Sequence, residues 1–152
     1  MRDLLVAEAV LSRFEGTSKK QVLQDLAAHA AALLSIDAQT IFDVLWEREK
    51  LGTTGVGGGI AIPHGRIAGL ENVKAIFAQL KAPIDFEAVD EKPVDLIFLL
   101  LAPTDAGADH LHALATVSRT LRDAHLCERL RAAKNQETLY RLLMETPSAE
   151  AA

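Results

Sequence analysis

The chain of 152 residues is long enough to bury one sizeable core, and its 49% hydrophobic content excludes a disordered protein. A formal net charge of −5 provides no basic surface for general nucleic-acid binding and no attraction to anionic lipid, so neither nucleic acid nor membrane is expected as a partner. Cys127 is the single cysteine, which excludes an intrachain disulfide and favours a cytoplasmic location. The N-terminal residues carry charges throughout, which a signal peptide would not, and the longest apolar run, 96–102, is too short to span a bilayer.

Two amphipathic helices are predicted in the first third of the chain. Ser18 can cap the first, over residues 18–34, with Gln21 as its capping-box partner. Asp37 can cap the second, and Gly52 supplies its stop. Apolar residues recur at helical spacing in both segments, so each helix is expected to pack one face against a core.

The middle of the chain predicts strands rather than helices. Residues 53–59 are too rich in glycine for regular structure. Two short apolar runs follow, 75–82 and 94–102, and prolines bound them. Because the second run is continuous rather than alternating, it is expected to be a central strand covered on both faces.

Helical spacing returns after Pro103, in the segment HLHALATVSRTLRD. The predicted apolar face of this helix consists of Leu111, Leu114, Val117 and Leu121. A shorter helix is expected over 126–133, and Asn135 can cap a last one that runs to Met144. Residues 147–152 are expected to be a frayed tail. Helices at both ends with strands between them predict a compact α/β domain.

His64 is a candidate reactive residue, because a proline precedes it and a glycine follows it. Proline restricts the backbone and glycine permits unusual dihedral angles, so these flanks can fix the direction of a side chain on a loop. A neutral imidazole is a nucleophile toward phosphorus near neutral pH, and Arg48 or Arg66 could stabilise the charge of a phosphoryl group. The alternative is a turn histidine that makes only local hydrogen bonds.

The glycine run before His64 is a candidate anion-binding loop. Small residues over 55–62 leave backbone N–H groups open, and consecutive amides of this kind form concavities that bind anions. The run lacks the Lys-Ser/Thr ending of a nucleotide P-loop, so ATP binding is not supported and no cofactor is expected. The glycines expected to approach a phosphate are Gly55, Gly57, Gly58, Gly59 and Gly65.

A second histidine site is HLH, from His110 to His112. Residues two apart on a helix do not share a face, so the pair is a poor metal site and only one of the two can face His64. No metal is therefore assigned, and a metal-dependent hydrolase is the least supported function because no carboxylate-rich ligand set accompanies these residues. Each of the two could equally be a solvated or capping histidine. His29 and His125 have no supporting neighbours and are assigned no role.

Residues 47–66 resemble the active-site signature of the fructose–mannitol class of enzyme IIA domains of the phosphoenolpyruvate-dependent phosphotransferase system. The acidic signature position falls on Glu49, and the apolar-Ala-apolar-Pro-His-Gly core falls on 60–65. The similarity continues to RLRAAKNQETLY and covers nearly the whole chain, and its later segments resemble most closely the nitrogen-regulatory branch. The resemblance implies a single domain over 1–146, with a mixed β-sheet flanked by helices on both faces.

The resemblance also implies roles for individual residues. His64 matches the phosphorylated histidine, with Nε2 as the acceptor atom and Nδ1 held by a backbone acceptor. Arg48 matches an arginine that supports the phosphate, and His110 matches a second histidine that assists at the active site. Arg66 is not a signature position and is expected only as a contact at the rim.

Two functions of different classes follow. The first is a phosphotransferase component, a phosphocarrier that accepts a phosphoryl group on His64 from the phosphohistidine of an HPr-like protein. The second is a regulatory binding module whose phosphorylation state selects its partners. The nitrogen-regulatory branch implies potassium transporters or sensor kinases as such partners. A sugar-permease component that passes phosphate to an enzyme IIB is an alternative.

Overall fold

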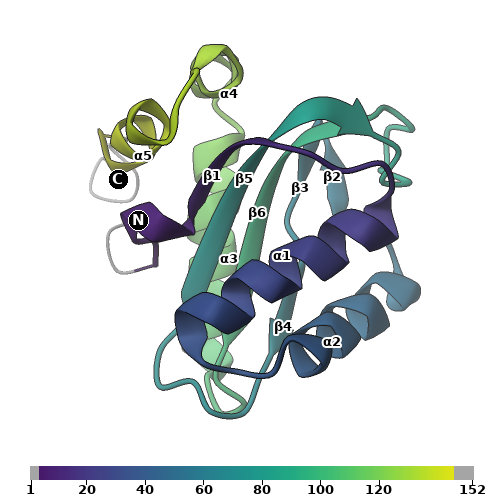
Figure 1. Cartoon of the computed structure of the whole chain (residues 1–152), viewed down its shortest axis with the longest axis vertical. Coiled ribbons are helices and arrows are strands. Elements are labelled where there is room, and N and C mark those ends of the chain that lie inside the picture. The colour runs from purple at the N-terminus through teal and green to yellow at the C-terminus, as the bar shows by residue number, and fades with distance from the viewer. Residues whose placement is uncertain (1–3, 146–152) are drawn as a thin grey trace.

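A six-stranded mixed β-sheet lies at the centre of the computed structural model, which describes residues 4–145 (Figure 1). The strand order is β1-β5-β6-β3-β2, and β4 also pairs with β6. The strands are β1 (Val10–Phe14), β2 (Gly55–Gly57), β3 (Ile60–Ala61), β4 (His64–Arg66), β5 (Lys74–Ile84) and β6 (Val94–Ala102). The tail predicted over 147–152 lies outside the described residues.

The strand β6 is central in the sheet, as the continuous apolar run predicts. It pairs antiparallel with β5 on one side and parallel with β3 and β4 on the other, while β1 runs parallel to β5 at the sheet edge. Every residue of β6 except Asp95 is buried. A strand that is covered on both faces needs apolar side chains at successive positions, which explains why the run does not alternate.

Helices cover both faces of the sheet, so the expected fold class is confirmed. Figure 1 shows α1 and α2 on one face and α3 on the other. The last helix, α5, packs against β1 and the short 3₁₀ helix η1 near the N-terminus. The helical elements are η1 (Ala7–Ala9), α1 (Lys19–Leu34), α2 (Ala38–Leu51), α3 (Gly107–Leu121), α4 (Ala124–Ala132) and α5 (Gln136–Glu145).

Side-chain caps define the starts of α1, α2 and α5, as the sequence predicts. The Ser18 hydroxyl accepts a hydrogen bond from the Gln21 amide at 3.1 Å, and the Asp37 carboxylate accepts one from the Thr40 amide at 3.0 Å. Asn135 accepts from the Thr138 amide at 2.8 Å at the start of α5. Each cap satisfies a backbone N–H that the helix itself leaves without a partner.

Two expectations about regular structure are wrong. Residues 53–59 are not entirely irregular, because β2 forms within them and pairs antiparallel with β3. The predicted apolar face of α3 is right for Val117 and Leu121, which are buried, but wrong for Leu111, which is 66% exposed. His110, Ala113, Thr116 and Thr120 also lie on the inward face. The helix therefore buries the more polar His110 in place of Leu111.

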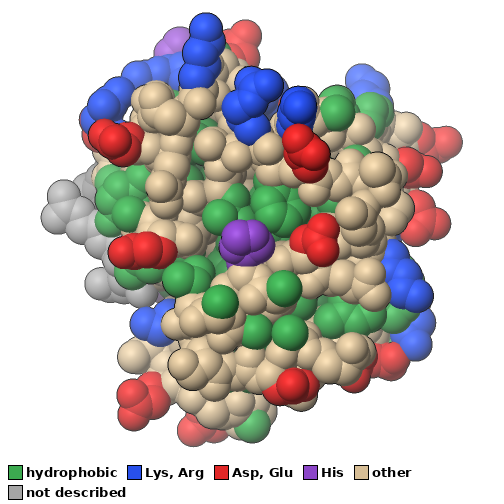
Figure 2. Space-filling model, viewed as in Figure 1, with side chains coloured by type: hydrophobic (Ala, Val, Ile, Leu, Met, Phe, Trp, Pro, Cys, Tyr) green, Lys and Arg blue, Asp and Glu red, His purple; other side chains and the backbone are tan. Residues whose placement is uncertain are grey.

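The charged surface is mixed. On the face shown in Figure 2, Lys and Arg side chains gather mainly toward the end where α4 lies, and acidic side chains lie among them. No helix within residues 4–145 combines the length and the apolar character that a membrane crossing requires.

Candidate active site

The short strand β4 positions His64 at the centre of the candidate site. His64 pairs in parallel register with Leu100 of β6, so the residue begins a strand instead of lying in a free turn. Its Nδ1 lies 2.9 Å from the carbonyl oxygen of Ile62. A carbonyl oxygen can only accept, so Nδ1 carries the proton and, in the neutral ring, Nε2 carries the lone pair.

Arg48 lies beside this lone pair. It belongs to the last turn of α2, and its Nε lies 3.4 Å from His64 Nε2. Its Nη1 donates to the carbonyl oxygen of Gly52 at 2.8 Å, which fixes the direction of the guanidinium group. Because a guanidinium only donates, Nε2 of His64 faces a permanent positive charge.

Gly65 allows α2 to approach β4 closely. A Cβ atom at this position would lie only 2.4 Å from Cγ1 of Val44, a distance that no real contact allows. Val44 lies one helical turn before Arg48, so the close packing of helix on strand brings the arginine to His64. Gly65 is therefore required for packing beside the site.

His110 completes a cluster with His64. Their ring centroids lie 5.5 Å apart at an interplanar angle of 71°, an edge-to-face arrangement. His110 is 7% exposed, and its Nδ1 accepts from Nε of Arg66 at 3.4 Å. Its Nε2 is buried and has no hydrogen-bond partner among the described residues. A buried polar atom without a partner costs about 1–3 kcal/mol, so this atom is a candidate contact for a ligand.

Both rings favour the neutral state. Burial is the main reason why the pKa of His64 is lowered, and the Arg48 guanidinium also lowers it. The hydrogen bond to Ile62 and the Glu49 carboxylate act in the opposite direction, but they do not cancel the lowering. Burial also lowers the pKa of His110, with smaller contributions from His64 and Arg66. A neutral imidazole with a free lone pair beside a cation can attack an electrophilic centre that carries negative charge.

Glu49 has a structural position behind the site. Its carboxylate is buried, forms an ion pair with Lys19 of α1 at 2.8 Å, and accepts from the Thr54 amide at 3.1 Å and from the Thr54 hydroxyl. These contacts hold the segment after α2, whose Gly52 carbonyl in turn holds Arg48. Sequence reasoning missed Lys19 and Gly52, because neither residue carries a local signal for this role.

The structure does not bring the turn Gly57–Gly59 to His64. The carbonyl oxygen of Gly59 accepts from the amides of Asp95 and Leu96 at the start of β6. His64 pairs with Leu100, four residues further along the same strand. At about 3.3 Å per residue, this turn lies about 13 Å along β6 from His64. The candidate site therefore excludes this turn.

Other contacts account for the glycine run. Gly57, Gly58 and Gly59 have φ values of +103°, +68° and +81°, which the turn between β2 and β3 requires. The Gly58 amide donates to the Asp90 carboxylate at 3.0 Å, and the Gly55 amide donates to the Thr53 hydroxyl at 3.0 Å. Both amides therefore have partners within the chain.

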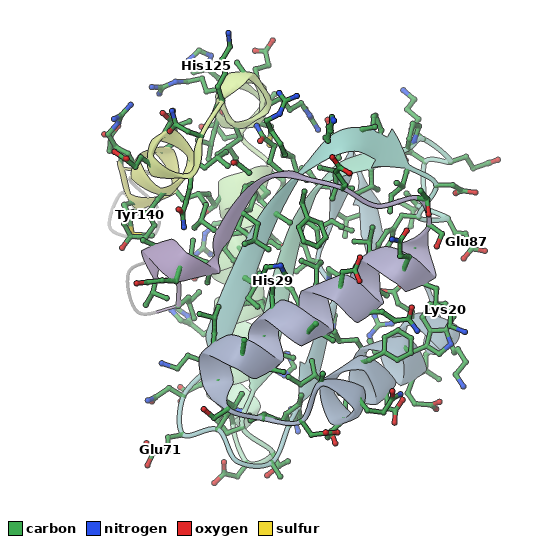
Figure 3. All side chains as sticks on the ribbon, viewed as in Figure 1. Lys20, His29, Glu71, Glu87, His125 and Tyr140 are labelled. Carbon is green, nitrogen blue, oxygen red and sulfur yellow. The ribbon has the colours of Figure 1, made fainter. Side chains whose placement is uncertain are left out.

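The remaining histidines lie outside the cluster. His112 is exposed on α3, next to the buried His110. Figure 3 shows His29 on α1 and His125 on α4, and His29 packs edge to face against Phe14 at 5.6 Å. Within residues 4–145, no group of three or more His, Cys, Asp or Glu side chains is arranged to hold a metal ion.

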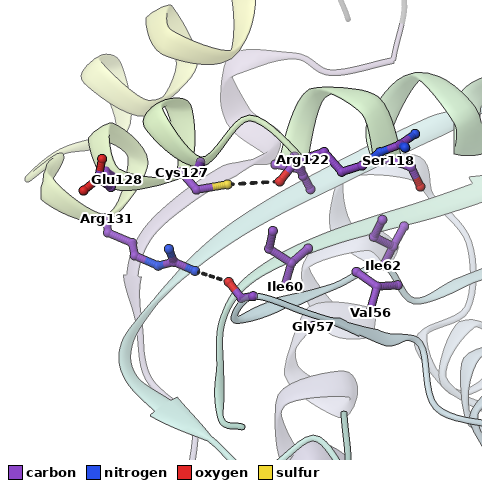
Figure 4. A pocket seen from close by; sticks show the side chains of 12 residues that line it. Val56, Gly57, Ile60, Ile62, Ser118, Arg122, Cys127, Glu128 and Arg131 are labelled. Atoms are coloured by element: carbon purple, nitrogen blue, oxygen red, sulfur yellow. Dashed lines mark hydrogen bonds between the residues drawn. The ribbon is translucent and has the colours of Figure 1, made fainter. Parts of the chain in front are cut away.

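A groove of about 720 Å³ lies between the β2–β3 hairpin and the helices α3 and α4 (Figure 4). Ile60, Ile62 and Cys127 line it, and Arg131 lies at its margin, where it donates to the Gly58 carbonyl at 2.7 Å. The Cys127 thiol donates to the Leu121 carbonyl at 3.2 Å, and burial raises its pKa. Ile62 contributes to both features, since its carbonyl oxygen also holds His64.

The amino-acid sequence matches a known protein family over nearly its whole length. The model described as "Phosphoenolpyruvate-dependent sugar phosphotransferase system, EIIA 2" matches residues 3–146. The chain belongs to the EIIA 2 family. The resemblance that the signature around His64 indicates is therefore confirmed, and the family is that of a phosphotransferase component.

Members of the EIIA 2 family with a regulatory name are similar to this chain. A "Nitrogen regulatory protein" of Bradyrhizobium diazoefficiens is 51% identical over 149 residues, covering 98% of this chain and 97% of the relative. The crystal structure of nitrogen regulatory protein IIA-Ntr from Neisseria meningitidis is 34% identical with a TM-score of 0.86, covering 93% of this chain and 97% of that chain. These similarities support the nitrogen-regulatory branch.

A more distant solved structure of an EIIA protein shares the fold. The mannitol enzyme IIA of Escherichia coli, solved in complex with phosphorylated enzyme IIB, is 18% identical with a TM-score of 0.78. The match covers 94% of this chain and all of that chain. At this identity the likeness shows the fold alone.

Proposed function

We propose that the protein is a phosphocarrier that accepts a phosphoryl group on Nε2 of His64 from the phosphohistidine of an HPr-like protein. The observation that carries the proposal is the 2.9 Å contact between Nδ1 of His64 and the carbonyl oxygen of Ile62. The Ile62 carbonyl keeps the proton on Nδ1, so Nε2 carries the lone pair, which accepts from Nε of Arg48 at 3.4 Å. Membership of the EIIA 2 family supports this chemistry.

The transfer is a single displacement at phosphorus. The Nε2 lone pair of His64 forms the new N–P bond while the donor's N–P bond breaks, and the donor imidazole recovers the electron pair of that bond. Nδ1 of His64 keeps its proton and its hydrogen bond to Ile62, so the ring becomes a phosphorylated imidazolium. Because one N–P bond replaces another, the protein contributes mainly alignment and charge stabilisation.

The surrounding residues have separate tasks in this reaction. Arg48 stabilises the negative charge on the phosphoryl oxygens, and its bond to the Gly52 carbonyl keeps it in place before the donor arrives. His110 lies edge-on to His64 and contributes a further polar group from α3.

We infer that the phosphorylation state controls the choice of partner. A phosphoryl group adds negative charge and three acceptor oxygens beside His64, which changes the recognition of any protein that binds this surface. The relatives named nitrogen regulatory protein support a regulatory output. On the resemblance described above, the controlled partners are potassium transporters or sensor kinases, and the protein acts in the cytoplasm.

The second candidate is a sugar-transport role in which phosphate passes on to an enzyme IIB. The fold shared with the mannitol enzyme IIA, which was solved with its phosphorylated IIB, favours a test of this alternative. Incubation of the phosphorylated protein with an isolated IIB domain separates the two roles. Rapid transfer of the label to IIB supports the transport role, and retention of the label supports the regulatory role.

Labelling tests the phosphocarrier proposal directly. The protein is incubated with labelled phosphoenolpyruvate, enzyme I and an HPr-like protein, and acid-labile label on the chain is measured. We expect His64→Ala to abolish the label and His112→Ala, a change at an exposed histidine nearby in sequence, to retain it. Equal labelling of His64→Ala and the unmodified chain contradicts the proposal.

Affinity capture tests the regulatory proposal. His64→Asp adds a negative charge at the phosphorylated position, and His64→Ala cannot be phosphorylated there. Immobilised forms of both variants and of the phosphorylated chain are compared for the proteins that they retain. Identical sets of bound proteins for all three forms exclude a phosphorylation switch.

A further inference from the structure

Arg66 touches the cluster at a point that the phosphocarrier proposal does not use. Its side chain extends from β4, two residues after His64, and its Nε lies 3.4 Å from Nδ1 of His110. Within residues 4–145 it forms no ion pair with a carboxylate. Among the described residues, His110 is therefore the side chain with which this guanidinium forms a hydrogen bond.

The chemistry of this contact determines where the proton of His110 lies. A guanidinium has five N–H donors and no acceptor, so the nitrogen that faces it must offer a lone pair. In a neutral imidazole, one nitrogen carries the lone pair and the other carries the proton. With Arg66 at Nδ1, the proton of His110 lies on Nε2.

Nε2 of His110 is a donor without an acceptor. The atom is buried and makes no hydrogen bond to any described residue. The neighbouring ring, His64, offers no acceptor either, because its Nδ1 donates to Ile62 and its Nε2 lone pair faces Arg48. The centroid of the His64 ring lies 5.5 Å from that of His110, so a phosphoryl group on His64 would bring acceptor oxygens close to the His110 ring.

We propose that Arg66 is a positioning residue that holds His110 in the Nε2–H tautomer, so that His110 donates a hydrogen bond to a phosphoryl oxygen on His64. The opposite tautomer would turn a lone pair toward the phosphoryl oxygens and repel them. Arg66 thus acts on the reaction through His110 and does not itself bind the phosphoryl group. The inference rests on the proposed phosphocarrier function, which it deepens.

Nitrogen-15 NMR of the unphosphorylated chain tests the tautomer without any transfer reaction. Long-range proton–nitrogen correlations of His110 at pH 8 are expected to show an unprotonated Nδ1 and a protonated Nε2. In Arg66→Met both nitrogens should move toward intermediate shifts, because the second tautomer becomes populated. Arg66→Lys keeps a donor and should retain most of the original pattern. Arg129→Met removes an exposed arginine on α4 and should change nothing.

Transfer kinetics test the consequence for the reaction. We expect Arg66→Met to slow phosphoryl acceptance by about tenfold, a size typical of coupled neighbouring residues. Arg66→Lys should recover most of the rate, and Arg129→Met should leave it unchanged. In a His110→Ala background, Arg66→Met should cause no further loss, because the residue through which it acts is missing.

The outcomes separate failure of this inference from failure of the proposed function. A protonated Nδ1 on His110 in the unmodified chain overturns the inference, as does an unchanged nitrogen pattern in Arg66→Met. An equal loss of rate from Arg66→Met with and without His110 also overturns it, because Arg66 then acts on the phosphoryl group or the donor directly. Persistent labelling of His64→Ala contradicts the phosphocarrier function but leaves the tautomer measurement valid.

Discussion

The Cα of Gly65 lies so close to the Val44 side chain that a methyl group at Gly65 would approach Val44 Cγ1 to 2.4 Å. This contact joins β4 to α2, and the two elements carry His64 and Arg48 respectively. The contact between His64 and Arg48 therefore depends on the absence of a side chain at Gly65.

Gly65→Ala is expected to destabilise the protein and to slow phosphoryl acceptance. Overpacking of this kind costs about 1–3 kcal/mol, and displacement of α2 moves Arg48 away from His64. Urea unfolding and the labelling rate measure the two effects. Gly107→Ala is the matched control, because a Cβ there meets nothing within 4 Å and the residue opens α3. A stable Gly65→Ala variant with the full labelling rate would contradict this account of the packing.

Gly58→Ala separates the turn function of the glycine run from phosphate binding. Gly58 has a φ of +68°, so alanine there is expected to cost about 1–2 kcal/mol of stability. The rate of phosphoryl acceptance should remain unchanged, because the turn lies far along β6 from His64. Gly58→Asn should be better tolerated, since asparagine adopts this conformation more readily. Loss of transfer without loss of stability in Gly58→Ala would show that the glycine amides do bind phosphate.

The acceptance rate should remain high in mildly acidic solution. Free histidine has a pKa of about 6.5, and the pKa of His64 is lower than this, mainly because the ring is buried and, to a smaller extent, because the Arg48 guanidinium lies beside it. The neutral nucleophile thus persists as the pH falls through about 6.5, and the rate declines only at lower pH. Rates measured between pH 5 and 8, with the donor phosphorylated beforehand, give the profile. A midpoint above 6.5 would contradict the expectation.

The same shift has a consequence for stability. Because the pKa is lowered in the folded state, the unfolded chain binds more protons between the two values, so stability increases with pH in this window. The contribution is fully present above about 6.5 and is lost as the pH falls through the folded value. His64→Gln should flatten this part of the curve of unfolding free energy against pH. An unchanged slope in His64→Gln would show that other groups cause the dependence.

Glu49→Gln is expected to destabilise the protein by about 3–5 kcal/mol, because it removes the buried partner of Lys19 and leaves that ammonium with only the exposed Glu87 carboxylate at 3.4 Å. The double variant Lys19→Met/Glu49→Gln removes both charges and should recover part of the loss. Urea unfolding of the single and double variants gives the coupling between them. Equal stability of the single variant and the unmodified chain would contradict a structural role for this ion pair.

Local signals predicted much of the fold. Ser18, Asp37 and Asn135 mark helix starts because a cap depends only on residues a few positions away. The central strand β6 was also predicted from local sequence, because its apolar residues follow one another without interruption. The strand β1 escaped prediction, because VLSRF at the sheet edge is only partly buried and alternates poorly. Pairing with β5, far along the chain, makes it a strand.

The candidate site depended on long-range information. His64 has informative flanks, but its contacts to Arg48 and His110 join residues 16 and 46 positions apart. Residue chemistry left Arg48 and Arg66, and likewise His110 and His112, as alternatives, and the family resemblance selected Arg48 and His110. Long-range packing also explains why Leu111 of α3 was wrongly predicted to be buried. Periodicity favoured Leu111 as a core residue, whereas the packing of the helix directs His110 toward β4.

Ile62 gives the groove of Figure 4 a direct mechanical connection to the reactive ring. Its side chain forms part of the groove wall, and its carbonyl oxygen, on the same short segment, sets the protonation of Nδ1 on His64. One residue therefore contributes both to the wall of the groove and to the hydrogen bond that sets the proton of His64 on Nδ1.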